Sequence, residues 1–512
     1  MLGLLLILGL AAGLRLYAIN ASSFWLDEFC SVETSTGRGL AHVALPTNVF
    51  MPSPGSLTTL TAATPWWSIW TSMRLDNHPP LYFILLRFWR DVFGQSDTAA
   101  RTLSVVPSLA AIVLLFDAVL VSTRRTSVAL WSAALMAVAM PQVHFAQEAR
   151  GYSLLVATEL AACAALVRCQ CLGFSRRRAL ALGASVLAML LTHYYAIAPA
   201  AALGIYALCR LRGPARIKSI AALGAGAVVF AVVWGPFLWQ QRTGVAVNNS
   251  WQIDNVPDHL WSTAQRIAVL PLRLLSETLA GRSPQTDNYW PIAWIAAVLY
   301  VAPLLLLRRR PDLLLWYLIF IIPVCLVAAV DLADDRRQTA IIRYTQMAGP
   351  GLYVLIAAAF SEAPARYRHL LPGAMCLACF LTLFTAGAYS EDMDSRLLAD
   401  AIGPDAQSGV PVVFASAGHP DWYAGALYLM ASHYTDIRGP IMLLSHPAPP
   451  DWEEALRSAP PSRLWLVAGS KTDQPDQLLP GVGFQDTPDT HLYLPNLAAD
   501  VWIVDLSQPS KP

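Results

Sequence analysis

The first polar break in the sequence, residues 22–31, reads SSFWLDEFCS and follows an apolar run that begins at residue 2. Its two adjacent carboxylates, Asp27 and Glu28, come where a hydrophobic helix would leave a lipid bilayer. Charged groups at the edge of a membrane persist mainly where they face water, a cavity or a partner. The pair is therefore either a solvated cap at the interface or part of a functional site, and its position alone favours neither.

The composition of the whole chain is typical of a polytopic membrane protein. Of its 512 residues, 55% are apolar and 13% are charged, and the mean hydropathy is +0.46. Soluble domains carry roughly 25% charged residues. The 35 basic and 34 acidic side chains nearly cancel, so no global basic field would attract nucleic acid. We expect the lipid bilayer, and no nucleic acid, as a partner.

Eleven segments are apolar enough to be interpreted as membrane-spanning helices, since a span needs about 20 apolar residues. The first is interpreted as a retained span, because no basic region precedes its apolar run. The predicted spans are residues 2–19, 98–121, 127–146, 152–170, 178–195, 196–211, 218–239, 290–307, 312–331, 345–360 and 369–389.

The basic residues of the loops predict the orientation of these spans. Clusters of arginine and lysine fall between alternate pairs of spans, at residues 124–125, 176–178, 210–218, 308–310 and 366–369. Because Lys and Arg gather on the cytoplasmic side of membranes, we expect these loops and the N-terminus to be cytoplasmic. The outer side then receives a long loop, residues 20–97, a second loop, residues 240–289, and the C-terminal tail.

Within the first loop, residues 77–90 read NHPPLYFILLRFWR and are amphipathic. The two prolines suit the first turn of a helix, where a missing N–H is no loss. We predict a helix that lies on the outer leaflet rather than a further span, because an added span would invert the charge rule for every later loop. The aromatic stretch at residues 65–70 is also expected in the interface.

The tail changes character, because short β-like runs alternate with helix-like runs. The β-like runs are residues 410–415, 441–445, 464–468 and 501–506, and the helix-like runs are residues 395–402, 422–432 and 452–457. This alternation predicts a small α/β domain with a partly parallel sheet. We therefore divide the chain into a membrane module, residues 1–390, and a C-terminal domain, residues 391–512, which is long enough for its own core.

Several side chains that can carry chemistry collect on the predicted outer side. Asp27 is ordinarily ionised at neutral pH and could accept a proton from an attacking hydroxyl, while Glu28 would point about 100° away on a helix. His78 and His193 are either hydrogen-bonded structural residues or parts of a site, and Glu148 on the same side brings these interpretations close to even. No spacing resembles a metal motif, so we predict no metal or cofactor and leave a divalent cation open.

Arg343 and Tyr344 lie at the outer start of the tenth predicted span. A basic cluster on the outer side runs against the usual charge bias and needs a local reason. The planar fork of arginine matches phosphate oxygens bidentately, which suits the phosphate of a lipid-linked donor. The alternative is a topological flank paired with a nearby aspartate, and both interpretations stay open.

Five short motifs occur in order along roughly residues 1–360. They are FWLDE (24–28), HPPLY (78–82) with FGQS (93–96), QEARGY (147–152), THYY (192–195) and RY (343–344). In this order and topology they resemble the GT-C class of polytopic glycosyltransferases, which contains protein O-mannosyltransferases and the lipid A aminoarabinose transferase. The expected fold is thus an α-helical polytopic membrane protein of GT-C type with a small C-terminal α/β domain.

The resemblance implies the inverting transfer of one sugar from a polyprenyl-phosphate donor to an acceptor on the outer face. Asp27 would be the general base that activates the acceptor hydroxyl. Arg343 and Tyr344 would hold the leaving phosphate. The substrate pocket would also involve Glu28, His78, Tyr82, Glu148, Arg150, Tyr152, His193 and Tyr194. The tail matches nothing in the class, so the acceptor is left open between a lipid, a glycan and a protein.

Compact loops and the lack of a retention signal favour a bacterial inner membrane with a periplasmic tail. Two other classes of function remain as alternatives. A flippase or transporter of polyprenyl-linked sugars would show ionisable residues or broken helices near the bilayer midplane. The acidic and histidine residues of this chain mostly lie on one face instead, and Asp117 is an exception without an explanation in the sequence. A noncatalytic subunit of a cell-envelope assembly would tolerate replacement of Asp27.

Overall fold

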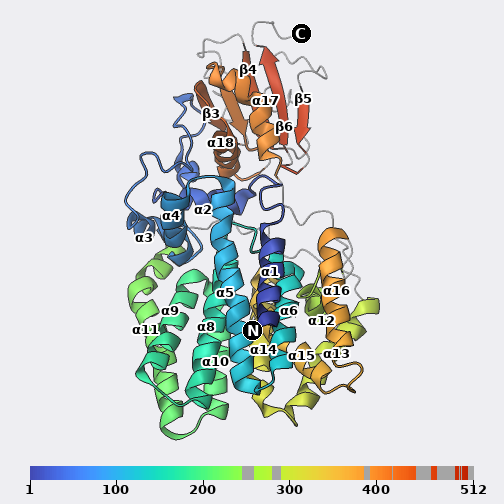
Figure 1. Ribbon diagram of the computed structural model, residues 1–512. Helices are drawn as coiled ribbons and strands as arrows, with labels where there is room; N and C mark the ends of the chain where they lie inside the picture. The colour runs from blue at the N-terminus through green and yellow to red at the C-terminus, as the bar shows by residue number, and fades with distance from the viewer. Residues whose placement is uncertain are drawn as a thin grey trace. The chain divides into compact units, whose positions relative to one another are not determined.

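The structure is a computed structural model that describes residues 1–244, 259–278, 290–385, 393–417, 419–445, 463–469, 491–494, 496–497 and 499–505 (Figure 1). The chain forms two compact units, and it passes between them several times. The first unit comprises residues 1–19, 77–82 and 100–389, and the second comprises residues 20–76, 83–99 and 390–512.

The first unit is built from helices, and each predicted span coincides with one of them (Figure 1). They are α1 (Leu2–Leu16), α5 (Asp97–Thr123), α6 (Thr126–Val138) with α7 (Met140–His144), α8 (Tyr152–Cys171), α9 (Arg176–Thr192), α10 (Ile197–Arg210), α11 (Gly213–Gly244), α13 (Trp290–Leu307), α14 (Leu314–Asp334), α15 (Gly349–Ser361) and α16 (Leu370–Thr385). A further helix, α12 (His259–Arg273), lies in the predicted second outer loop. Its sequence mixes apolar and polar residues, and it is not among the described helices that are apolar enough to cross a membrane.

By length and composition, four helices among the described residues can cross a membrane, namely Asp97–Thr123, Tyr152–Cys171, Gly213–Gln241 and Pro311–Asp334. Shorter apolar helices accompany them, at Leu2–Leu16, Thr126–Val138, Val298–Leu307, Gln346–Ser361 and Leu370–Phe384. The predicted class, a multi-pass helical membrane protein, is confirmed.

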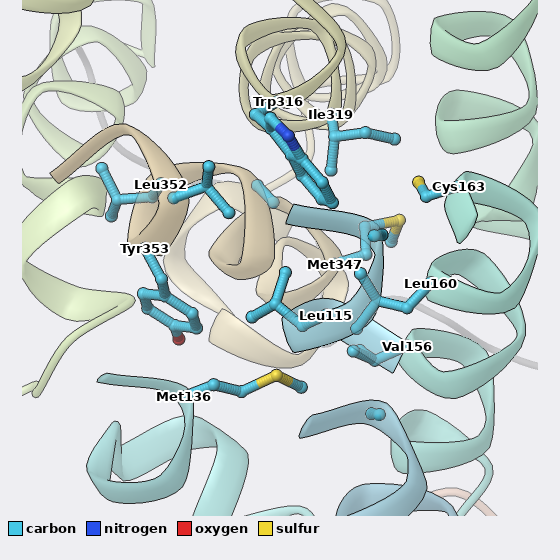
Figure 2. Close-up of a cluster of buried hydrophobic side chains, with 14 of the residues drawn as sticks. Leu115, Met136, Val156, Leu160, Cys163, Trp316, Ile319, Met347, Leu352 and Tyr353 are labelled. Carbon is cyan, nitrogen blue, oxygen red and sulfur yellow. The ribbon is translucent and has the colours of Figure 1, made fainter. Parts of the chain in front are cut away.

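The core of the first unit joins α5, α6, α8, α14 and α15. Figure 2 shows part of it, with Trp316 of α14 close to Met347 and Leu115. Small residues let the helices approach: a Cβ on Gly351 would lie 2.4 Å from the carbonyl oxygen of Trp316, and a Cβ on Gly226 would lie 2.5 Å from that of Gly183. Such close approach is how helices pack where lipid supplies no hydrophobic drive.

A buried arginine bonds to the backbone carbonyls where a predicted single span breaks into α6 and α7. Pro141 in the first turn of α7 cannot continue the preceding helix. Arg15 of α1 donates to the carbonyl oxygens of Ala137 (2.9 Å) and Met136 (3.3 Å), and its Nε donates to Ser108 Oγ (2.8 Å). Backbone groups in a membrane protein need hydrogen-bond partners inside the protein. Arg15 supplies donors to two carbonyl groups at this end of α6.

The exceptional Asp117 has a structural explanation. Its carboxylate pairs with Arg168 of α8 through both oxygens, at 2.5 and 2.6 Å. Asp117 lies six residues before the end of α5 and Arg168 three residues before the end of α8. The pair therefore ties two neighbouring helix ends together, and Asp117 gives no support to a transport pathway.

A second carboxyl in a span, Glu159 of α8, is fully buried, and neither of its oxygens has a hydrogen-bond partner among the described residues. We expect Glu159→Met to raise the free energy of unfolding by about 1–3 kcal/mol, because burying a polar group without a hydrogen bond costs that much. Thermal and denaturant unfolding of the purified protein in detergent would measure it. Thr158→Val is the matched control, since the Thr158 hydroxyl only donates to helix carbonyls, and a lower stability of Glu159→Met would contradict the prediction.

The second unit combines the first loop with the tail (Figure 1). The loop contributes α2 (Leu26–Thr34), β1 (Met51–Pro52), α3 (Ser68–Ser72) and most of α4 (Leu81–Phe93). The tail contributes α17 (Ser395–Gln407), β2 (Val412–Ala415), α18 (Trp422–Tyr434), β3 (Pro440–Leu444), β4 (Arg463–Gly469), β5 (His491–Leu494) and β6 (Ala499–Asp505). The amphipathic stretch after the prolines is helical as predicted, and its place on the outer leaflet stays a prediction.

The sheet has the strand order β1-β3-β2-β4-β6-β5. Strands β3, β2 and β4 are parallel, whereas β1, β6 and β5 pair antiparallel to their neighbours. The predicted partly parallel sheet is confirmed. Its two edge strands, β1 and β5, were not predicted. The helix expected at residues 452–457 lies outside the described residues. The domain boundary at residues 390–391 stays a prediction. The tail sheet also includes a residue of the first loop, because Met51 pairs with Ile441.

Candidate functional site

The predicted site residues belong to both units. Asp27 and Glu28 lie in the second unit. The first unit holds the others, which are His78, Tyr82, Glu148, Arg150, Tyr152, His193, Tyr194, Arg343 and Tyr344. Each group is described within its own unit.

In the first unit, the HPPLY and QEARGY motifs meet. Arg150 Nη2 lies 2.9 Å from His78 Nε2. The Tyr82 hydroxyl lies 3.0 Å from Ser104 Oγ, which in turn donates to the carbonyl oxygen of Arg150 at 3.1 Å. A Cβ on Gly151 would approach Tyr82 Cβ to 3.3 Å, so a glycine after Arg150 allows the two motifs to pack this closely. The structure thus brings the histidine of the HPPLY motif and the arginine of the QEARGY motif into one cluster.

His193 follows the last residue of α9 and joins the same cluster. Its ring centroid lies 6.0 Å from that of His78 and 6.0 Å from that of Tyr152. Its Nδ1 accepts a hydrogen bond from the backbone N–H of Tyr195 at 3.1 Å. Burial, followed by the influence of the nearby His78, Arg150 and Arg343, lowers the pKa of His193 well below its usual range. The imidazole is therefore neutral at pH 7, with its proton on Nε2.

The Arg343-Tyr344 motif reaches this cluster through a chain of aromatic rings. The Tyr344 ring lies 5.4 Å from that of Tyr195, which stacks on His193 at 5.6 Å. The guanidinium carbon of Arg343 lies 5.6 Å from the centre of the Tyr344 ring. Arg150 and Arg343, separated by nearly 200 residues in sequence, both contribute to the lowered pKa of His193. We call His78, Arg150, His193 and Arg343 the cationic cluster.

The segment before Arg343 is held by two residues that sequence reasoning missed. Asp331, at the end of α14 and fully buried, accepts from the backbone N–H groups of Gln338 and Thr339, both at 2.7 Å. Arg273 of α12 donates to the carbonyl oxygens of Ala340 (2.6 Å) and Thr339 (3.2 Å). These charge-assisted bonds are of the stronger kind and give the segment a defined path.

Tyr194 and Glu148 have different surroundings from the cationic cluster. The Tyr194 hydroxyl donates to Gln241 Oε1 and accepts from Trp234 Nε1 (2.9 Å), and Gln241 Nε2 donates to the His78 carbonyl oxygen at 3.1 Å. Tyr194 therefore supports His78 indirectly, through α11. Glu148 is buried and pairs with His144 Nε2 at 2.8 Å, a contact whose i, i+4 spacing could have been recognised in the sequence.

In the second unit, the two adjacent carboxylates differ in their environments. Glu28 is fully buried, and its Oε2 accepts from the backbone N–H of Trp25 at 3.3 Å, which caps α2. Asp27 is half-buried in the first turn of the same helix. Among the described residues no group of three His, Cys, Asp or Glu side chains could hold a metal ion. The absence of a metal stays a prediction.

The lowered pKa of His193 predicts an acid-sensitive fold. An unfolded chain takes up a proton at histidine near pH 6.5, whereas the folded chain resists it, so the unfolded state binds more protons below that pH. We expect the free energy of unfolding to fall by up to about 1.4 kcal/mol per pH unit as the pH drops below 6.5. His193→Asn, which keeps an acceptor for the Tyr195 N–H, should flatten this decline.

Denaturant unfolding in detergent between pH 7.5 and pH 5 measures the effect. His369→Asn is the control, because His369 is exposed and does not belong to the cationic cluster. Equal slopes for wild type and His193→Asn would contradict the prediction.

Comparisons with known proteins find one family model and several similar solved structures. Residues 77–239 match the family model described as dolichyl-phosphate-mannose-protein mannosyltransferase. No curated protein matches the chain in a sequence search. Among solved structures, the chain is similar to ArnT from Cupriavidus metallidurans bound to undecaprenyl phosphate, with 14% identity, 99% of both chains covered and a TM-score of 0.56.

Two further structures are similar over long stretches. The apo state of the same ArnT gives 14% identity and a TM-score of 0.57, covering 99% of this chain and 98% of that one. The apo oligosaccharyltransferase of Archaeoglobus fulgidus gives 10% identity and a TM-score of 0.45, covering 91% of this chain and 69% of that one. The ArnT matches extend over both compact units of the chain.

Proposed function

The chain has the fold of the GT-C glycosyltransferases, and on this premise we propose that it moves a single sugar from a polyprenyl-phosphate donor to an acceptor. The observation that carries the proposal is the cationic cluster. Arg150 is bonded to His78, the ring of His78 lies 6.0 Å from that of the buried His193, and Tyr344, next to Arg343, reaches His193 through Tyr195. Such a set suits a phosphate that is attached to an apolar chain.

The cationic cluster has a specific task in this reaction. When the bond between the anomeric carbon and the phosphate oxygen breaks, the leaving polyprenyl phosphate gains negative charge. Positive groups that are already in place stabilise that charge at no cost of reorganisation during the reaction. His193 Nε2, which carries the ring proton, can donate a hydrogen bond without adding a further positive charge beside the two arginines. Arg343 and Tyr344 hold the leaving phosphate, and Tyr82, Glu148, Tyr152 and Tyr194 shape the walls.

The general base is Asp27. It takes the proton of the acceptor hydroxyl as the acceptor oxygen attacks the anomeric carbon, and the phosphate leaves from the opposite face, which inverts the configuration. A single displacement of this kind needs no covalent sugar–enzyme intermediate. Glu28 supports the base by capping the helix that carries it. No metal or cofactor takes part in this proposal.

We place the reaction on the outer face of a bacterial inner membrane, where the predicted topology puts all of the motifs. The donor carries a hexose or a pentose, and the acceptor is a lipid, a glycan or a protein. A flippase would explain an ionisable residue inside the bundle, but Asp117 is paired with Arg168. Glu159 has no such pair among the described residues, so the transporter stays the alternative, and replacement of Asp27 tests the noncatalytic subunit.

The test uses membranes that contain the full chain and matched membranes that lack it. Both are supplied with a panel of polyprenyl-phosphate sugars that carry a radiolabel on the sugar. The expected result is label in a new lipid, glycan or protein product only where the chain is present, and the product then identifies the acceptor. Label that crosses the membrane without forming a new bond would identify a flippase instead. Membranes with no product from any donor would contradict the proposed function.

A further inference from the structure

We propose that the C-terminal tail acts as a positioning element for the general base, through a hydrogen-bond network of Asp97, Arg396, His433 and Tyr434. The inference rests on the proposed role of Asp27. All residues of this network lie in the second unit. It gives the tail a part in catalysis.

The centre of the network is the carboxylate of Asp97, at the start of α5, which is 8% exposed. Its Oδ1 accepts from His433 Nε2 at 3.0 Å. Its Oδ2 accepts from the Tyr434 hydroxyl and from Arg396 Nη2, both at 2.8 Å. The three donors come from the two tail helices, α17 and α18. A buried carboxylate with three donors is a rigid anchor, because losing any one of them leaves a buried polar group unpaired.

The same donors hold the segment that carries Asp27. The backbone N–H of Phe24 donates to the Tyr434 hydroxyl oxygen at 3.0 Å. Arg396 donates to the side-chain oxygen of Asn20 (2.7 Å) and to its carbonyl oxygen (3.0 Å). Tyr434 and Arg396 therefore connect Asp97 to both ends of residues 20–24. Helix α2 begins two residues after Phe24, at Leu26.

Aromatic packing extends this hold into α2 itself. Phe24 and Phe29 lie on either side of Asp27 in the sequence, and the ring centroids of both lie 5.3 Å from that of His433. The Leu26 N–H donates to Met393 Sδ at 3.0 Å. The first turn of α2, which presents Asp27, is thus hydrogen-bonded to the tail at Leu26 and packed against it at Phe29. A shift of the tail helices would move the base.

His433 is bonded through both ring nitrogens, since its Nδ1 lies 2.6 Å from Thr58 Oγ1. The order hydroxyl, imidazole, carboxylate resembles a nucleophilic triad. Thr58, however, is 2% exposed, and Arg90 donates to its carbonyl oxygen at 2.6 Å, so the hydroxyl is enclosed within the network. We assign this arrangement a positioning role: Thr58 fixes the ring of His433, and His433 fixes Phe24 and Phe29.

Tyr434→Phe tests the inference, because it removes the acceptor of the Phe24 N–H and one donor of Asp97 while keeping the ring. The matched control is Tyr428→Phe on the same helix. The Tyr428 hydroxyl donates to the Gly55 carbonyl oxygen at 2.7 Å and lies 3.1 Å from Ser53 Oγ, away from residues 20–29. Both variants are purified and compared with wild type in sugar transfer, with kcat and the donor KM measured separately.

The expected result is a fall of about tenfold or more in kcat for Tyr434→Phe, with the donor KM within about twofold of wild type, because a displaced base slows chemistry and the cationic cluster is untouched. Tyr428→Phe should keep its kcat. Arg396→Gln, whose side chain is partly exposed, is a second variant with the same expected signature if Tyr434→Phe does not fold.

Three outcomes would overturn the inference. They are a wild-type kcat in Tyr434→Phe or Arg396→Gln, an equal loss of kcat in Tyr428→Phe, and a loss that appears only in the donor KM. A wild-type protein that transfers no sugar from any donor would instead remove the proposed function, and the inference with it. The wild-type assay therefore separates the two failures.

Discussion

Asp27→Asn is expected to lower the kcat of sugar transfer by about 10²–10⁴-fold, the range that a general base contributes, while donor binding stays unchanged. The asparagine keeps the size of the side chain but cannot take the proton of the acceptor hydroxyl. Because the donor phosphate is assigned to the first unit and Asp27 lies in the second, the donor KM should not change. The measurement is labelled-sugar transfer by purified wild type and variant at matched concentration.

The control for this variant is Asp91→Asn. Asp91 also lies in the second unit, but its side chain is 45% exposed and pairs with Arg87 at 3.0 Å on α4. A surface pair of this kind contributes about 0–1 kcal/mol, so both folding and activity should persist. If Asp27→Asn transferred sugar as fast as wild type, Asp27 would not be the base, and the noncatalytic interpretation would gain ground.

Arg343→Gln is expected to lower kcat/KM by about 10²–10³-fold, which is the cost of removing one preorganised group from a developing oxyanion. The loss should appear in kcat and also in weaker binding of the product, polyprenyl phosphate, because the arginine contacts the phosphate before and after transfer in the proposed mechanism. Arg343→Lys should restore only part of the activity, since an ammonium lacks the bidentate fork. Binding is measured with polyprenyl phosphate as an inhibitor.

Arg337→Gln is the matched control for Arg343. Arg337 lies six residues earlier in the same segment, but its side chain is exposed. Removing its charge leaves the Asp331 and Arg273 bonds to Gln338, Thr339 and Ala340 in place. Equal losses in both variants would mean that general electrostatic attraction, rather than the placement of Arg343, binds the donor.

The kinetic effects that we expect differ between variants of the first unit and variants of the second unit. Asp27 and the Asp97 network should affect kcat, whereas the cationic cluster should affect both kcat and the interaction with polyprenyl phosphate. A set of variants measured under one protocol would show whether this division holds. Glu159→Met provides a reference in which stability rises with no group removed from either part of the proposed machinery.

Much of the helical framework could be predicted because the signal is local. A span must be a long apolar run with its backbone bonded internally, so the positions of α5, α8 and α11 follow from hydropathy alone. Four strands of the tail sheet, β2, β3, β4 and β6, were recognisable for a similar reason, as short apolar runs between turns. Strand β1 was missed, because two residues carry no periodic signal and Met51 pairs with a strand almost 400 residues away.

The candidate site was predictable as a set of motifs but not as an arrangement. Glu28 resembles Asp27 in the sequence, yet it caps α2. Arg15 and Glu159 lie in apolar runs where one charged residue does not disturb the hydropathy, and only the structure distinguishes the bonded arginine from the carboxyl without a hydrogen-bond partner among the described residues. Asp331 and Arg273 give no motif at all, because they act on backbone atoms of another segment.

The sequence by itself determined the membrane character, the order of the helices and the motifs that carry chemistry, because each depends on residues that are neighbours along the chain. Only the tertiary structure decided which of them meet. Arg150 and His78 are 72 residues apart and Phe24 and Tyr434 are 410 apart, and no local pattern encodes either contact. Both arise when the apolar faces of distant helices pack, and that packing is a property of the whole fold.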